Sequence, residues 1–245
     1  RCFEVEERLK ELLDIPVFHD DQHGTAIVVL AGVINALKVV GKTKENCRVV
    51  VNGAGSAGVA ITKLLLTYGF SYITMCDING TICRDSKHLN WMQQKMAEVT
   101  NPDQLHGTLA DALKGADIFI GVSAPNIVTK EMVASMNSDA ILFAMANPVP
   151  EIMPDLAKEA GARVVGTGRR DFPNQVNNVI AFPGIFRGAL EGRASQITEE
   201  MKLAAANAIA SLIGENQLSD TNILPEAFDP RVADAVSAAI KALIR

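Results

Sequence analysis

The stretch "VVVNGAGSAGVAITKLLL", residues 49–66, decides the fold class of this 245-residue chain. Gly53, Gly55 and Gly58 follow a run of valines in a G-x-G-x-x-G pattern and come directly before an amphipathic run. This order predicts a buried strand, a tight turn and a helix that packs closely on the strand.

The same glycines predict a dinucleotide site. In such a loop the first glycine makes the turn, the second lets the backbone approach a pyrophosphate, and the following helix offers N–H donors to the phosphates. The alternative is a glycine turn in an α/β protein without such a ligand. The residues expected to contact the cofactor are Gly53, Ala54, Gly55, Ser56, Ala57 and Gly58.

A carboxylate follows at the distance that such a cofactor requires. Asp77 ends the run "YITMCD" and lies about 20 residues beyond the last glycine, where it would bond the ribose hydroxyls. This acid favours NAD over NADP. Arg84 and Lys87 keep NADP open, because either could reach a 2′-phosphate, although both also suit a solvated surface.

The wider pattern predicts an α/β fold. Strand and helix patterns alternate from residue 22 to about 190, as in βαβ units. Helix patterns occur at 56–68, 86–97, 129–136, 152–160, 198–214 and 231–244. Apolar runs typical of strands buried on both faces occur at 48–53, 72–77, 117–122, 140–146 and 162–168. We expect a Rossmann-like, doubly wound, mostly parallel sheet flanked by helices.

Composition and charge exclude several classes of protein. The net charge of −5, with no run of basic residues, argues against a nucleic-acid partner. The longest apolar stretch, residues 26–37, is too short to span a bilayer, so we expect a buried helix and no membrane segment. No secretory signal is visible.

The cysteines indicate a reducing compartment. Cys2, Cys47, Cys76 and Cys83 form no CxxC pair and no cysteine–histidine cluster at zinc spacing. We therefore expect reduced thiols in a cytoplasmic protein and no structural zinc.

Polar segments follow three of the predicted strands, where ligands of open parallel sheets bind. Ser123 lies in "GVSAPN" and is expected to contact the cofactor. Asn147, in "MANPVPE", could bind a carboxylate or the nicotinamide amide, or could serve only as a turn residue. Asn177 and Asn178, in "DFPNQVNNVIAFPGIF", need partners if buried, either in a site or in a structural network.

Two adjacent acids stand near the start of the chain. Asp20 and Asp21 lie in "IPVFHDDQHGTA", residues 15–26, between a short strand-like run and a long helix-like run. A solvated turn would explain the pair if it stood alone.

Four segments together resemble the malic enzymes. They are "PVFHDDQHGTA", "GAGSAG", "ANPVPE" and "PNQVNNVIAFPG", and their order and spacing are those of the shorter bacterial type. Malic enzymes oxidise and decarboxylate malate to pyruvate with a nicotinamide cofactor and Mg²⁺ or Mn²⁺. The resemblance covers essentially the whole chain and implies a cytoplasmic homodimer that uses NAD, or alternatively NADP.

The resemblance also implies roles for single residues. Asp21 matches the metal ligand of the family, and Asp20 matches the neighbouring catalytic acid, which helps to orient a lysine. Asn147 and Asn178 match residues that contact malate and line the cofactor site.

The sequence departs from the family at its beginning. The general-base lysine, the acid tyrosine and a Glu-Asp pair of metal ligands all belong upstream of Arg1. We therefore expect a fragment, with residues 1–21 ending an N-terminal domain, 22–195 forming the NAD(P)-binding domain and 196–245 forming C-terminal helices. The helices at both ends would pack on the partly missing second domain.

Two other functions remain open. The first is a dehydrogenase of similar fold that acts on an amino acid or a folate without decarboxylation and without a metal. The second is a non-catalytic module that binds NAD(H) without turnover.

Overall fold

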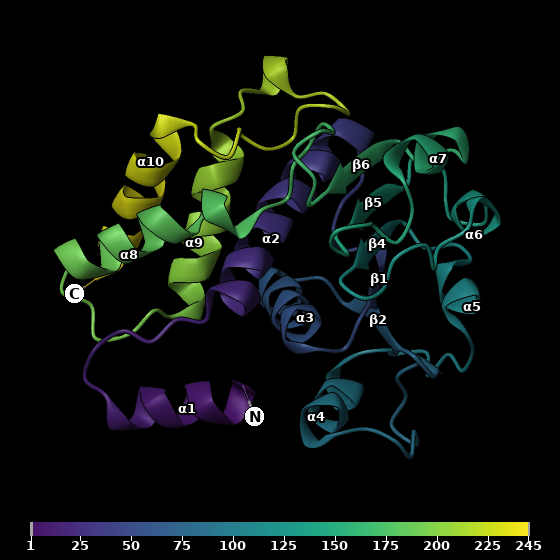
Figure 1. The fold of residues 1–245 in the computed structure, drawn as a ribbon, viewed down its shortest axis with the longest axis horizontal. Helices are drawn as coiled ribbons and strands as arrows, with labels where there is room; N and C mark the ends of the chain where they lie inside the picture. The colour runs from purple at the N-terminus through teal and green to yellow at the C-terminus, as the bar shows by residue number, and fades with distance from the viewer. Residues whose placement is uncertain (1, 245) are drawn as a thin grey trace.

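A six-stranded sheet forms the centre of the computed structural model, which describes residues 2–244 (Figure 1). The strand order is β3-β2-β1-β4-β5-β6, and all neighbours are parallel except the β2–β3 pair. The strands are β1 (Arg48–Asn52), β2 (Tyr72–Asp77), β3 (Gly80–Thr81), β4 (Ile118–Gly121), β5 (Ile141–Ala144) and β6 (Val164–Thr167). The predicted mostly parallel α/β sheet is therefore confirmed.

Helices cover both faces of this sheet. In Figure 1, α2 and α3 lie on one side and α5, α6 and α7 on the other, while α8, α9 and α10 form a layer beyond α2. The helices are α1 (Cys2–Leu12), α2 (Asp20–Val40), α3 (Ser56–Tyr68), α4 (Trp91–Val99), α5 (Leu109–Leu113), α6 (Lys130–Ala134), α7 (Pro154–Glu159), α8 (Phe182–Glu191), α9 (Glu199–Ser211) and α10 (Pro230–Lys241), with short 3₁₀ turns η1 (Asn178–Ile180) and η2 (Glu215–Gln217).

The core divides into two parts, one on each face of the sheet. Val49 and Val51 of β1 belong to the larger part, beneath α2 and α3, whereas Val50 points to the opposite face and belongs to the smaller part. This alternation follows from the pleat of a strand. Because both faces are covered, the central strands are apolar throughout, which is why the sequence pattern located them.

Helix α2 is the central helix of the larger core. It has 21 residues and is apolar enough to cross a membrane by length and composition, but 72% of its apolar window is buried inside the protein. Asn35, in its middle, donates from Nδ2 to the carbonyls of Ala210 (2.8 Å) and Ile223 (3.0 Å). The expected buried helix is confirmed, and it begins at Asp20, within the segment that contains both acids.

Local capping explains where one predicted helix begins. The pattern predicted a helix over 86–97, but α4 begins at Trp91 because Asn90 is its N-cap. The Asn90 side chain accepts from the backbone N–H groups of Met92 and Gln93, and the Gln93 side chain accepts from the Asn90 N–H. This reciprocal pair satisfies backbone donors that would otherwise be free at the helix start.

Three elements and one loop differ from the sequence prediction. Strand β3 and helix α5 have two and five residues, too few to show a period. Helix α8 was not predicted because its segment read as polar loop, although Pro183 in its first turn is compatible with a helix start. The strand-like run at residues 15–18 forms no strand.

Candidate functional site

The glycine loop connects β1 to α3 in the predicted way. Gly53 has a φ of 113°, and a Cβ atom there would lie 2.5 Å from the Val122 carbonyl oxygen. A Cβ at Gly58 would collide with the Gly53 carbonyl oxygen. The loop is open at Gly55, the N-cap of α3, where a Cβ atom would have no described neighbour within 4 Å. The backbone N–H groups at the start of α3 are thus accessible to an anion.

A cavity of about 440 Å³ lies beside this loop. Its lining includes Asn52, Gly53, Asp77 and Ser123, which come from the ends of β1, β2 and β4. Strand β2 lies on one side of β1 and β4 lies on the other, so the strand order reverses at β1. The cavity therefore lies at the switch point of the sheet. The structure therefore brings three of the predicted cofactor contacts, Gly53, Asp77 and Ser123, to one cavity.

Asp77 is held at the end of β2 by a local turn. Its Oδ1 accepts a hydrogen bond from the Asn79 N–H at 2.7 Å, and the side chain is half-buried. The carboxylate thus has a defined position on the wall of the cavity. Arg84 and Lys87, the residues that would favour NADP, both reach solvent, and the Arg84 Nε lies 3.9 Å from Glu98.

A buried glutamate that the sequence analysis did not single out orders the neighbouring loops. Glu151 is fully buried. Its Oε1 accepts from the Ser123 N–H (2.9 Å) and Oγ–H (3.2 Å), and its Oε2 accepts from the Ala146 N–H (2.9 Å). Ser123 Oγ also accepts from Asn52 Nδ2 at 2.7 Å. The carboxylate therefore connects the loop after β4 to the loop after β5, which carries Asn147.

Asn147 lies on the surface of that second loop. Its side chain is exposed, and its peptide bond to Pro148 is cis. The neighbouring Ala146 N–H donates to Glu151, which also accepts from Ser123, and the Pro148 carbonyl accepts from Arg169 Nη1 at 3.5 Å. Through Ala146 and Glu151, the loop that carries Asn147 is thus connected to Ser123 of the cavity.

A second group of predicted residues meets at the start of α2. Asn178 Nδ2 donates to Asp20 Oδ2 at 2.5 Å, although the two residues are 158 positions apart. Asp20 Oδ1 is buried and has no hydrogen-bond partner among the described residues 2–244. Burial and the negative charge of Asp21 raise the pKa of Asp20, against the opposing effect of the Asn178 hydrogen bond. Asp21 is exposed beside it.

The two adjacent asparagines have different roles. Asn177 Oδ1 accepts from the Val179 N–H at 3.0 Å, which caps the 3₁₀ turn η1. Asn178 instead extends to Asp20. One residue of the pair is thus structural, and the other belongs to the acidic group.

The donor set at this point fits a hard divalent cation. Mg²⁺ and Mn²⁺ prefer oxygen ligands, and Asp20 and Asp21 are adjacent carboxylates, one of them with a buried oxygen that lacks a partner among the described residues. Both stand in the first turn of α2. Two carboxylates cannot complete an octahedral shell, so a metal here would need further oxygen ligands.

Next to this group, a buried network of three polar side chains joins three helices. His23 Nε2 lies 2.5 Å from Glu6 Oε1, and Lys202 Nζ lies 3.1 Å from His23 Nδ1. A protonated Lys202 can only donate, and its contact with Nδ1 then assigns the His23 proton to Nε2, which faces Glu6. Burial lowers the pKa of both His23 and Lys202. This network connects α1, α2 and α9, and no sequence motif indicated it.

Comparison with known proteins identifies the family. The family model described as "Malic enzyme, NAD binding domain" matches residues 22–243. The chain is 59% identical to the bifunctional malic/malolactic enzyme of Bacillus subtilis (strain 168) and 57% identical to the NAD-dependent malic enzyme of Geobacillus stearothermophilus. In both alignments 98% of this chain is covered, but it spans only 58% and 50% of those relatives.

A solved structure gives the same result. The NAD-dependent malic enzyme of Thermotoga maritima superposes with a TM-score of 0.94 at 49% identity, over 98% of this chain and 63% of that one. This agreement includes the sheet and the helices around it. The chain therefore belongs to the malic enzyme family and contains the NAD-binding domain of that family.

Proposed function

We propose that this chain is the cofactor-binding part of an NAD-dependent malic enzyme, which converts malate to pyruvate and CO₂. The observation that carries the proposal is the hydrogen bond between Asn178 and Asp20. Each residue lies in one of the two segments most specific to the family. This contact places an amide next to a pair of acids. The amide could hold a substrate carboxylate, and the acids could hold a metal.

The cofactor site that we propose consists of the glycine loop and the cavity beside it. The N–H groups at the start of α3 would bind the pyrophosphate, and Asp77 would accept hydrogen bonds from the adenosine ribose. Ser123 would contact the cofactor from the loop after β4. NAD is favoured because a carboxylate at this point repels a 2′-phosphate, and the exposed Arg84 lies near Glu98 instead.

Metal and substrate would bind at the start of α2. Asp21 is the proposed ligand of Mg²⁺ or Mn²⁺, and the other ligands would come from malate, water and residues outside this chain. When bound, the cation would polarise the malate hydroxyl and stabilise negative charge as CO₂ leaves.

The residues of this chain would bind and orient the substrate. Asn178 and Asn147 are neutral donors that can hold carboxylates without adding charge. Asp20, next to the proposed metal ligand Asp21 in the first turn of α2, would line the site and help to orient a catalytic lysine. Asn178, which donates to Asp20, would keep that carboxyl oriented.

We also propose the organisation of the whole protein. Residues 1–21 would end an N-terminal domain, 22–195 would form the NAD(P)-binding domain and 196–245 the C-terminal helices. Exposed apolar residues on and after α1, including Val5, Leu12 and Ile15, suit a homodimer or a further domain. We expect the protein in the cytoplasm.

A substrate panel tests this function. The full-length protein is assayed for NAD⁺ reduction with malate, amino acids and folates, each with Mn²⁺ or with EDTA. Among these substrates we expect turnover only of malate, in the presence of Mn²⁺, and we expect EDTA to abolish it. Metal-independent turnover of an amino acid or a folate would support the alternative dehydrogenase, and NAD⁺ binding without turnover would support the binding module.

A further inference from the structure

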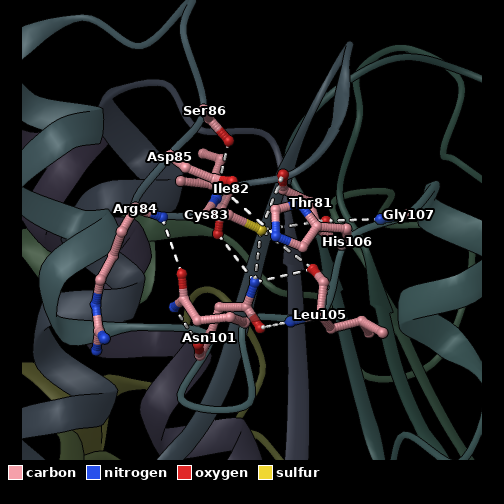
Figure 2. A network of polar contacts seen from close by, with 11 residues as sticks. Thr81, Ile82, Cys83, Arg84, Asp85, Ser86, Asn101, Leu105, His106 and Gly107 are labelled. Carbon is pink, nitrogen blue, oxygen red and sulfur yellow. Dashed lines mark hydrogen bonds and ion pairs between the residues drawn. The ribbon is translucent and has the colours of Figure 1, made fainter.

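Three potential metal ligands gather at the β3 edge of the sheet, outside the proposed active site (Figure 2). They are the thiol of Cys83, the carboxylate of Asp85 and the imidazole of His106. One ligand atom from each lies within 4.8 Å of the other two. One residue separates Cys83 from Asp85, but 20 residues separate Asp85 from His106, so no sequence motif indicated this cluster.

The cysteine of this cluster is fixed in position. Cys83 is fully buried, and its Sγ accepts from Asn101 Nδ2 at 3.2 Å and lies 3.2 Å from the Leu105 carbonyl oxygen, to which it can donate. Thr81 lies next to the sulfur, with its Oγ1 at 3.8 Å and its carbonyl oxygen at 3.9 Å. An N–H donor directed at sulfur stabilises a thiolate as well as a thiol.

Asn101 holds together the two segments that carry the ligands. Its Nδ2 also donates to the carbonyls of Ile82 (3.1 Å) and Leu105 (3.0 Å), and its Oδ1 accepts from the Leu105 N–H (2.8 Å). Figure 2 shows Asn101 beneath the sulfur, between these segments. The backbone of Cys83 is therefore fixed relative to that of Leu105 and the adjacent His106 before any metal binds.

The other two ligands stand on the solvent side of the sulfur. The side chains of Asp85 and His106 are 73% and 63% exposed, and the Asp85 Oδ1 to His106 Nε2 distance is 3.6 Å. This distance is longer than a hydrogen bond, and both exposed side chains keep their freedom to move. Both can therefore shift by the small amount that common coordination requires, while the open side admits water.

We propose that Cys83, Asp85 and His106 bind a Zn²⁺-class cation, with water as the fourth ligand. Thiolate and imidazole select a borderline cation over Mg²⁺ or Mn²⁺, and three protein ligands with one open position are common for zinc. On binding, the cation replaces the thiol proton, which leaves to solvent, and forms bonds to sulfur, oxygen and nitrogen. The thiolate and the carboxylate together balance the two positive charges.

This cation would brace one wall of the proposed cofactor cavity. The ligands lie on the segments that follow Gly80 and precede Thr108, and both of these residues line that cavity. The Thr81 N–H already donates to the Gly107 carbonyl at 2.9 Å, which joins the segments beside the cluster. The Gly107 N–H donates in return to Thr81 Oγ1 at 3.1 Å, and a metal would add a further connection between the segments. The metal site itself does not depend on the proposed malate chemistry.

Cobalt titration of the full-length, tag-free protein tests this site. After removal of bound metal, Co²⁺ is added while absorbance is recorded, because a thiolate bound to Co²⁺ gives a near-ultraviolet charge-transfer band that oxygen ligands do not give. This band separates the cluster from the acidic pair at Asp20 and Asp21. The variants are H106Q and D85N, whose exposed side chains can change without disturbing the core, together with C83S. The controls are H88Q and C2S, which alter an exposed histidine and an exposed cysteine.

We expect one Co²⁺ per chain to give the thiolate band, and Zn²⁺ to displace it. Loss of the His106 or Asp85 ligand should lower the metal affinity by at least about tenfold. Loss of a residue that only hydrogen-bonds to a metal ligand already lowers metal affinity by about that much. C83S should lose the band, and both controls should retain wild-type affinity. Absence of the band in the wild type, or its persistence at unchanged affinity in both H106Q and D85N, would overturn the proposal.

Discussion

Asn178 donates a hydrogen bond from Nδ2 to Asp20 Oδ2 at 2.5 Å, and this contact joins two segments that are 158 positions apart. The carboxyl is therefore oriented through one oxygen, and its buried second oxygen is left without a partner from the described residues. This arrangement suits a group that acts on a bound substrate, and it leads to the first prediction.

Replacing Asn178 with alanine should impair malate turnover. The variant loses the donor to Asp20 and the proposed donor to a malate carboxylate, so kcat/KM for malate should fall by about tenfold or more, equivalent to about 1.4 kcal/mol. Steady-state kinetics with Mn²⁺ measure this change. Asn177→Ala is the matched control, because the Asn177 side chain caps η1 and does not contact Asp20 among the described residues, so its kcat/KM should change much less. Equal losses in the two variants would show that the effect is structural.

Replacing Glu151 with glutamine should loosen the loops that carry Ser123 and Asn147. Glutamine keeps one acceptor but places an NH₂ group against a backbone N–H donor, which should lower the free energy of unfolding by about 1–3 kcal/mol. NAD⁺ affinity should fall as well, since Ser123 lines the cofactor cavity. Urea denaturation and NAD⁺ titration measure the two effects.

The control for this variant is Glu159→Gln. Glu159 pairs with Lys130 at the surface (2.8 Å), so its replacement should change stability by no more than about 0.5 kcal/mol. An E151Q protein with wild-type stability and wild-type NAD⁺ affinity would contradict the role given to Glu151.

Replacing Asp77 with serine should shift cofactor preference. Removal of the carboxylate takes away a ribose acceptor and a charge that repels a 2′-phosphate, so the ratio of NAD⁺ to NADP⁺ affinity should fall by about tenfold. Isothermal titration with both cofactors measures this ratio. Arg84→Ala serves as the comparison and should leave the ratio unchanged. If the wild type preferred NADP⁺ and the R84A variant no longer bound NADP⁺, the NAD assignment would fail.

Replacing Glu6 with glutamine should destabilise the protein at neutral pH. Burial would raise the pKa of Glu6, but hydrogen bonds from His23 and Lys10 lower it to about 2 from an ordinary 4.5. The charged form therefore contributes on the order of 2–3 kcal/mol above pH 4.5, and this contribution disappears as the pH falls from 4.5 toward 2.

Denaturation at a series of pH values checks that prediction. The difference in stability between the wild type and E6Q should be largest at neutral pH and should close through that acidic range. Glu7→Gln, which changes the neighbouring exposed acid, should have little effect at any pH. A difference that remained constant down to pH 2 would rule out the ion-paired state of Glu6.

The sequence allowed the sheet and the cofactor loop to be predicted, because their signals are local. The strands β1 and β4 are apolar along most of their length, and the spacing of Gly53, Gly55 and Gly58 encodes the turn itself. Short elements such as β3 gave no period. Helix α8 was missed because its first residues belong to a segment that read as polar loop, although Gly184 and Gly188 allow the helix to pack closely against Val236 and Ile240 of α10.

Contacts between distant segments could not be predicted in the same way. Asp20 and Asn178 were each singled out, but only the fold shows that they meet. Glu151 was missed because its partners include backbone N–H groups, which carry no sequence signal. The approach of His106 to Cys83 likewise depends on how two loops fold together, which the spacing of cysteines and histidines along the sequence does not indicate.

The most direct test of the central proposal is the stoichiometry of products formed from malate by the full-length protein with NAD⁺ and Mn²⁺. Pyruvate, CO₂ and NADH are measured in the same reaction. The proposed function predicts that the three form in equal amounts and that Asp21→Asn abolishes their formation. NADH formed without pyruvate, or no NADH at any concentration of malate and metal, would contradict it.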